Sequence, residues 1–150
     1  NVNNLQRQKF FEKIKNYFKD LKNKKFAIWG LSFKPNTDDI REAPSIDIIN
    51  NLIRFGAKIN AHDPVAIKNF KELFNENIEY FSDNYDTLKD CDALIINTEW
   101  SEYRQPDFNR IKKLLKNPII FDGRNLYDER KLSDLDFFYS NIGFHPNDDR

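Results

Sequence analysis

The sequence has few of the residues on which glycine-rich nucleotide loops and disulfide-linked folds depend. It contains four glycines, one cysteine and no methionine in 150 residues. A single cysteine excludes an internal disulfide and fits a reducing compartment, so we expect a cytoplasmic protein. No apolar run reaches the length of about 18 residues that a membrane-spanning helix needs. Because the chain starts at Asn1 without a methionine, we expect it to be part of a longer protein.

The sequence also has no excess charge of either sign. Its 24 basic residues balance its 24 acidic residues, whereas a nucleic-acid-binding domain usually carries a basic surplus. The two histidines, His62 and His145, lack metal-ligand spacing, so we expect no metal site. What is abundant is apolar and aromatic: 39% of the residues are hydrophobic and 14 are phenylalanine. This composition predicts one globular domain with a substantial core.

The order of the apolar segments predicts the fold class. Apolar residues recur at helical spacing from Leu5 to Leu21, which predicts an amphipathic helix that packs on this domain or on a partner. Short apolar runs then alternate with helical segments. Strands are expected at 26–30, 57–61, 93–96, 118–121 and 137–139, and helices at 43–55, 65–74, 83–89 and 106–115. This alternation predicts a Rossmann-like, three-layer α/β domain with a mostly parallel sheet.

Ligands of such sheets bind at the carboxyl ends of the strands, where the loop Gly30–Pro44 follows the first expected strand. Its single glycine argues against a backbone cradle for a dinucleotide pyrophosphate. The loop offers side chains instead, with Lys34 and Arg41 as cations for a phosphate and Phe33 as a flat apolar surface. Ion pairs within the loop are the alternative, and spacing alone favours them. The acids available for such pairs are Asp38, Asp39 and Glu42.

A second candidate loop, Phe121–Tyr127, follows the strand expected at 118–121. Gly123 allows the backbone to turn, so that Arg124 projects over the sheet edge. A salt bridge of Arg124 to Asp122 or Asp128 is the alternative. If Arg124 converges with the two cations of the first loop, a small anion site forms within a neutral protein.

Three other residues receive structural interpretations. Cys91 has no histidine or lysine beside it, so a buried structural thiol is favoured over a nucleophile. Asp63 precedes Pro64 and is interpreted as a turn residue, with ribose binding as the alternative. Trp100 is expected to pack over the strand ends.

The loop Gly30-Leu-Ser-Phe-Lys-Pro-Asn-Thr-Asp-Asp-Ile-Arg-Glu-Ala-Pro44 resembles the signature of the C-terminal domain of the UDP-glucose/GDP-mannose dehydrogenase family. The resemblance runs from about residue 2 to 144. Further matching motifs follow in the family's order at 56–64, 91–94, 97–100, 121–127 and 139–144. The last motif departs from the family at Phe144, where the family has arginine.

The resemblance implies a division of the chain and a role for it. Residues 1–22 would end a long central helix, 23–144 would form the UDP-sugar-binding domain, and 145–150 would be a loose tail. The implied activity is the four-electron oxidation of UDP-glucose to UDP-glucuronate with two NAD. NAD would be held mainly by an N-terminal domain that this chain lacks. The implied partners are that domain, the central domain and further copies in a homo-oligomer.

The family's motifs also imply individual roles. Phe33 and Lys34 would contact the UDP-sugar, with Lys34 near the diphosphate, and Arg124 would lie on the same side. Arg41 would reach toward the NAD. Cys91 does not match the motif of the family's catalytic cysteine, so no catalytic residue is expected in this chain.

Two alternatives stay open. The sugar nucleotide could be a UDP-N-acetylhexosamine or GDP-mannose, although residues 98–100 and 122–127 look most like the UDP-glucose branch. The chain could also be a stand-alone nucleotide-binding or regulatory module that performs no chemistry.

Overall fold

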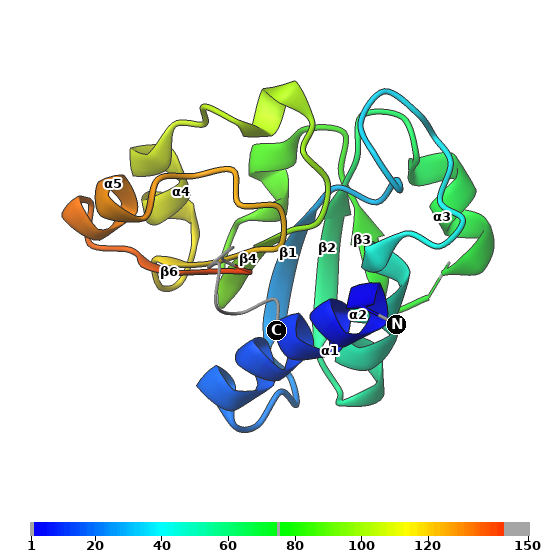
Figure 1. Ribbon diagram of the computed structural model, residues 1–150, viewed down its shortest axis with the longest axis horizontal. Helices are drawn as coiled ribbons and strands as arrows, with labels where there is room; N and C mark the ends of the chain where they lie inside the picture. Colours follow the sequence, from blue (N-terminus) through cyan, green and yellow to red (C-terminus); the bar gives the residue numbers. More distant parts are fainter. Residues whose placement is uncertain (1, 75, 143–150) are drawn as a thin grey trace.

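The computed structural model describes residues 2–74 and 76–142, which form a six-stranded sheet in the order β3-β2-β1-β4-β5-β6 (Figure 1). Every neighbouring pair of strands is parallel. The strands are β1 (Lys25–Trp29), β2 (Lys58–His62), β3 (Ile78–Tyr80), β4 (Ala93–Ile96), β5 (Ile119–Asp122) and β6 (Phe138–Asn141). The chain runs outward from β1 to β3, returns to β4 and then runs the other way. The topological switch point, where ligands of such sheets bind, therefore lies between β1 and β4.

The central strands are apolar without interruption because helices cover both of their faces. All four residues of β4 and of β5 are buried, and so are four of the five residues of β1. The edge strands β3 and β6 have no fully buried residue. This burial pattern confirms the Rossmann-like, three-layer prediction.

Helices α1 (Val2–Phe18), α2 (Pro44–Arg54) and α3 (Ile67–Leu73) cover one face of the sheet (Figure 1). The apolar stripe of α1 packs on this domain, since Phe10, Phe11 and Ile14 are buried in the same core cluster as residues of the strands. Helix α1 ends at Phe18, three residues before the predicted end, because Lys19 adopts a φ of 67° and turns the chain.

The other face is covered by α4 (Phe108–Leu114), α5 (Glu129–Asp134) and the 3₁₀ turns η1 (Asn84–Thr87) and η2 (Ser101–Tyr103). Trp29 and Tyr103 stack there with ring centroids 5.1 Å apart. The Trp29 indole N–H donates to the Thr87 hydroxyl at 3.0 Å, so this large side chain is buried with its polar atom satisfied.

Three elements were not expected from the sequence: β3, η2 and α5. All three are short, and β3 is an edge strand of three residues without an apolar run. The helix expected at 83–89 is the 3₁₀ turn η1. The expected tail at 145–150 lies outside the described residues. Within the described ranges, no helix combines the length and apolar character needed to cross a membrane.

Candidate functional site

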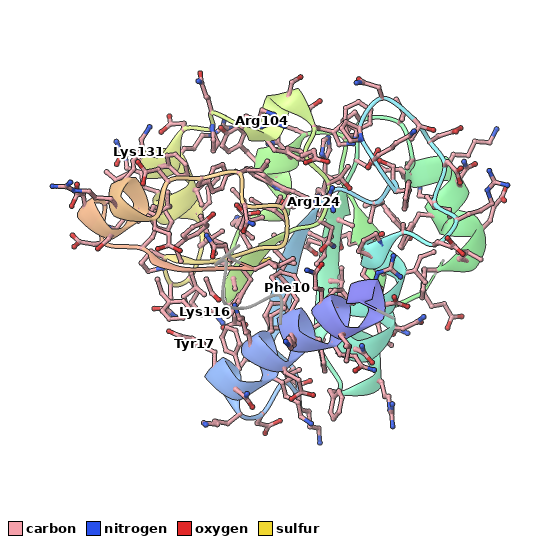
Figure 2. All side chains as sticks on the ribbon, viewed as in Figure 1. Phe10, Tyr17, Arg104, Lys116, Arg124 and Lys131 are labelled. Carbon is pink, nitrogen blue, oxygen red and sulfur yellow. The ribbon has the colours of Figure 1, made fainter. Side chains whose placement is uncertain are left out.

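A cavity of about 240 Å³ opens at the carboxyl ends of β1, β4 and β5. Its walls come from α1, the start of α2 and the loops that follow these strands. The lining residues include Arg7, Phe33, Lys34, Asn97, Gly123 and Arg124. Figure 2 labels Arg124, from the loop after β5, and Phe10 of α1, which also lines the cavity. Pockets for small ligands commonly enclose about 300–1,000 Å³, so this cavity has room for part of a large ligand.

The loop after β1 comes very close to the end of β4. Gly30 has a φ of 101°, and a Cβ placed on it would lie 2.5 Å from the Cβ of Thr98. The Thr98 hydroxyl donates to the carbonyl of Ser32 at 2.8 Å, and the indole N–H of Trp100 donates to the Ser32 hydroxyl at 3.3 Å. Glycine is required here because any side chain would collide with Thr98. Trp100 is buried over the strand ends, as predicted.

Asp63 holds this loop from the side of β2. Its carboxylate is 2% exposed and accepts four backbone N–H groups, from Leu31, Ser32, Val65 and Ala66, at 2.8–3.0 Å. Asp63 is therefore a turn residue, as predicted, and it also ties the β1 loop to the turn after β2.

The same contacts bear on dinucleotide binding. The N–H groups that directly follow Gly30, where a glycine-rich loop would cradle a pyrophosphate, are occupied by the Asp63 carboxylate. The space above Gly30 is filled by Thr98. This end of the sheet therefore does not fit the pyrophosphate of NAD, and any anion site here must be built from side chains.

Lys34 and Phe33 reach the cavity from the loop after β1, which Asp63 and Thr98 hold in place. The Ser32 hydroxyl donates to the Lys34 carbonyl at 2.9 Å, so the backbone that carries the amine is held in place. Within the described part of the chain, the Lys34 amine has no hydrogen bond and no close ion pair, but its charge acts on the Asp39 carboxylate, which is paired with Arg41. Phe33 is 43% exposed and presents its ring at the cavity. The structure therefore places one cation without a close ion pair beside one apolar surface.

Arg124 reaches the cavity from the loop after β5. Its guanidinium pairs with Glu99, Nη2 to Oε1, at 2.7 Å. The predicted alternative partners were Asp122 and Asp128, and the Asp122 carboxylate instead accepts the backbone N–H groups of Arg124 and Leu126. Arg124 therefore forms an ion pair, as in the alternative interpretation, but its partner is Glu99 because Asp122 is used to shape the loop.

Arg41 does not join the other two cations. It lines a separate hollow, its side chain is 87% exposed, and it makes a bidentate pair with Asp39 at 2.9 and 3.0 Å. The side-chain hydrogen bond from Arg41 lowers the pKa of Asp39 to about 2. Lys34, Arg41 and Arg124 therefore do not line one cavity, and Arg41 forms the ion pair that the sequence offered as the alternative.

The third cation at the cavity is Arg7, which the sequence did not single out. It comes from α1, pairs with Asp47 at 2.8 Å and donates to the Glu42 carbonyl at 2.6 Å. Asn97 at the end of β4 was also missed. It is 3% exposed, lines the cavity, and its amide nitrogen has no hydrogen-bond partner. The sequence signals for Asn97 were its place directly after the strand expected at 93–96 and at the start of the 97–100 motif.

Cys91 lies elsewhere, buried in the core on the other side of the sheet. Its thiol donates to the carbonyl of Thr87 at 3.1 Å, and burial raises its pKa to about 12. A thiol in this environment is a poor nucleophile, which confirms the structural interpretation.

Comparisons with known proteins place this geometry in context. The family model "UDP-glucose/GDP-mannose dehydrogenase family, UDP binding domain" matches residues 27–129. The UDP-glucose 6-dehydrogenase TuaD of Bacillus subtilis is 38% identical over 95% of this chain and 31% of its own length. A UDP-glucose 6-dehydrogenase of Pseudomonas aeruginosa is 37% identical over 94% of this chain and 32% of its own. The chain thus spans about a third of the curated relatives it matches.

Solved structures agree with the fold. A UDP-glucose dehydrogenase from Pyrobaculum islandicum superposes with a TM-score of 0.80 at 24% identity, covering 96% of this chain and 31% of that one. The UDP-N-acetyl-mannosamine dehydrogenase Cap5O from S. aureus gives a TM-score of 0.69 at 26% identity, covering 95% and 31%.

Proposed function

Since the chain belongs to the UDP-glucose/GDP-mannose dehydrogenase family, we propose that it is the nucleotide-sugar-binding domain of a UDP-glucose 6-dehydrogenase. The observation that carries this proposal is the cavity at the switch point, which Lys34, Arg124 and Phe33 line together. Lys34 binds the diphosphate of UDP-glucose as a point charge, Arg124 lies on the same side, and the Phe33 ring supplies an apolar contact.

The reaction itself belongs to regions outside this chain. Oxidation of UDP-glucose to UDP-glucuronate removes four electrons, which reduce two NAD to two NADH. The loop after β1 does not fit the pyrophosphate of NAD, so we place the cofactor mainly on an N-terminal domain, with Arg41 reaching toward it. Cys91 is buried with a raised pKa and does not serve as the nucleophile. The same proposal puts the enzyme in the cytoplasm as a homo-oligomer, with UDP-glucuronate as its product.

The size of the cavity predicts how strongly this chain alone binds the nucleotide. At about 240 Å³ it encloses less than the usual ligand pocket, so the rest of the ligand surface must be covered by another domain. Binding costs several kcal/mol in lost translational and rotational freedom, whether or not the other domain's part of the pocket is present. We therefore expect weak, measurable binding of UDP and no NADH production from UDP-glucose and NAD.

Calorimetric titration of UDP into this chain tests the proposal. Loss of a charged contact should weaken binding about tenfold or more in Lys34→Ala and in Arg124→Ala. Lys58→Ala is the matched control, because Lys58 is exposed at the opposite end of the sheet and should leave affinity unchanged. Equal titrations for all four proteins would refute the proposed site. NADH formation by this chain would refute the division of labour.

A further inference from the structure

Two buried donors at the cavity lack partners. In the described residues, the buried side-chain nitrogen and oxygen atoms without a hydrogen bond are Asn97 Nδ2 and Arg124 Nε, and both residues line the same cavity. Buried polar groups in folded proteins are satisfied in the great majority of cases, so each exception needs an explanation. Both exceptions occur in residues that line one cavity, so acceptors on a ligand in that cavity would explain both.

Both donors are held in place by their neighbours. Asn97 is fixed at the end of β4 by its backbone N–H, which donates to the Trp29 carbonyl at 2.9 Å. Arg124 is fixed by Glu99 through Nη2 and by Asp122 through its backbone N–H. The Glu99 pair sets the direction of the guanidinium, although the Arg124 side chain is one-third exposed. The orphan N–H groups are therefore preorganised, as binding groups in a rigid site are expected to be.

The charges around the cavity identify the class of acceptor. Its lining includes the cations Arg7, Lys34 and Arg124 and no aspartate or glutamate. Acids that interact with these cations are themselves paired: Glu99 with Arg124, Asp47 with Arg7, and Asp39, which the Lys34 charge also reaches, with Arg41. A cavity lined by donors without partners, by an amine without a close ion pair and by no carboxylate favours an anionic group with several oxygens.

We propose that Asn97 is a ligand-binding residue, whose amide N–H acts together with the Nε–H of Arg124 to bind diphosphate oxygens of the nucleotide sugar. This inference rests on the proposed function and adds to it a neutral residue that fixes the position of the diphosphate. Lys34 attracts the anion from any direction, whereas Asn97 and Arg124 Nε are directional donors that select one orientation.

The variant Asn97→Leu distinguishes a ligand-binding role of Asn97 from a structural role, because the two roles predict different effects on thermal stability and on UDP affinity. Leucine has a similar shape and removes a donor that has no protein partner, so the thermal midpoint without ligand should stay the same or rise. Affinity for UDP, followed by NMR chemical-shift titration up to millimolar ligand, should fall about tenfold, as for a lost hydrogen bond to a charged group.

Asn60→Leu is the matched control. Asn60 is also 3% exposed, but its amide donates to the Thr87 carbonyl at 3.0 Å. This variant should lower the thermal midpoint and leave UDP affinity within about twofold, since the lost hydrogen bond contributes to folding and lies outside the cavity. Asn97→Asp supplies a second test, because a carboxylate in the same place should repel the diphosphate and weaken UDP binding more than leucine does.

Pyrophosphate and uridine separate the parts of the ligand. Asn97→Leu should weaken pyrophosphate as it weakens UDP and should leave any shifts caused by uridine unchanged. If Lys34→Ala lowers the affinity for UDP while Asn97→Leu and Asn97→Asp keep the wild-type affinity, the role of Asn97 is overturned and the proposed function stands. If UDP causes no NMR chemical-shift changes in the wild-type chain, both the proposed function and the role of Asn97 are refuted. A lowered midpoint with unchanged affinity in Asn97→Leu assigns the residue to the fold and overturns the inference.

Discussion

Asp63 and Asn97 are both buried polar residues at the carboxyl edge of the same sheet, but their side chains differ in hydrogen bonding. Asp63, after β2, accepts four backbone N–H groups, whereas the amide of Asn97, after β4, lacks a partner. The first is satisfied within the chain and contributes to folding. The second has no partner in the described residues, and we propose that a ligand supplies one. A residue at a strand end is thus assigned to folding or to binding by its partners, not by its position.

Removing Asp63 is the change with the largest expected effect. Asp63→Ala leaves four backbone N–H groups without their acceptor, at roughly 1 kcal/mol or more each, so the free energy of unfolding should fall by about 4 kcal/mol. Urea denaturation measures this difference. Asp38→Ala is the control, since Asp38 is exposed in the same loop and its loss should cost less than about 0.5 kcal/mol. Equal losses would show that Asp63 does not hold the loop.

Gly30 should have the next largest effect. In Gly30→Ala the new methyl group would lie 2.5 Å from Thr98 in a backbone with φ of 101°, so overpacking and conformational strain together should cost about 3 kcal/mol. Gly56 is a matched control at φ 89°, where the nearest atom to a new Cβ is 3.3 Å away. Gly56→Ala should cost only the conformational term of about 1 kcal/mol. Thermal unfolding that ranks the two variants the other way would contradict the close approach of the β1 loop to β4.

Much of the fold could be predicted because burial on both faces leaves a clear trace in the sequence. The strand expected at 93–96 has the observed bounds of β4, and its four residues are apolar without interruption. Strand β3 could not be predicted, since three residues at the sheet edge need no such pattern. Helix α5 begins at a cap, where the Asp128 carboxylate accepts the backbone N–H of Arg130, and not at a long apolar run.

The candidate site was only partly readable from the sequence. Loop positions after predicted strands pointed to Lys34 and Arg124, which do line the cavity. Arg41 stands in the same loop as Lys34, and the sequence could not tell which of the two is neutralised by a neighbouring acid. Arg7 reaches the cavity only because of the way α1 lies on the sheet. That the Asn97 amide lacks a hydrogen-bond acceptor can be recognised only from the three-dimensional structure, which shows where all the possible acceptors lie.

Lys34 and Arg41 therefore form a comparison within one loop. Lys34→Ala should weaken UDP binding by about 2 kcal/mol, because a cation that lines the proposed binding cavity and has no close ion pair is lost. Arg41→Ala should leave UDP binding unchanged, since Arg41 is exposed, paired with Asp39 and outside the cavity. Isothermal titration of both variants in low salt gives the difference. A larger loss for Arg41→Ala would place the anion at the Asp39–Arg41 side of the loop.

His62, next to Asp63 in the chain, is a third buried polar residue at this edge of the sheet, and its charge can change with pH. Its Nδ1 lies 2.7 Å from the Tyr103 hydroxyl, and its Nε2 lies 4.0 Å from a carboxylate oxygen of Glu102. The charges of Asp63 and Asp83 favour the protonated ring, but burial opposes it more strongly and lowers the pKa of His62 below 6.5. The neutral ring is therefore the form that the fold stabilises.

The pH dependence that follows is the smallest of these effects. A histidine with a lowered pKa in the folded state contributes stability that is fully present above its unfolded pKa of about 6.5, and that contribution is lost as pH falls from there toward the folded pKa. Comparing wild type with His62→Gln by urea unfolding at several pH values isolates this contribution from the carboxylates that both proteins share. The stability advantage of the wild type should be constant above pH 7.5, roughly one unit above the unfolded pKa, and should shrink toward pH 5.5. An advantage that grows as pH falls would mean that Glu102 and the two aspartates stabilise the charged ring against burial.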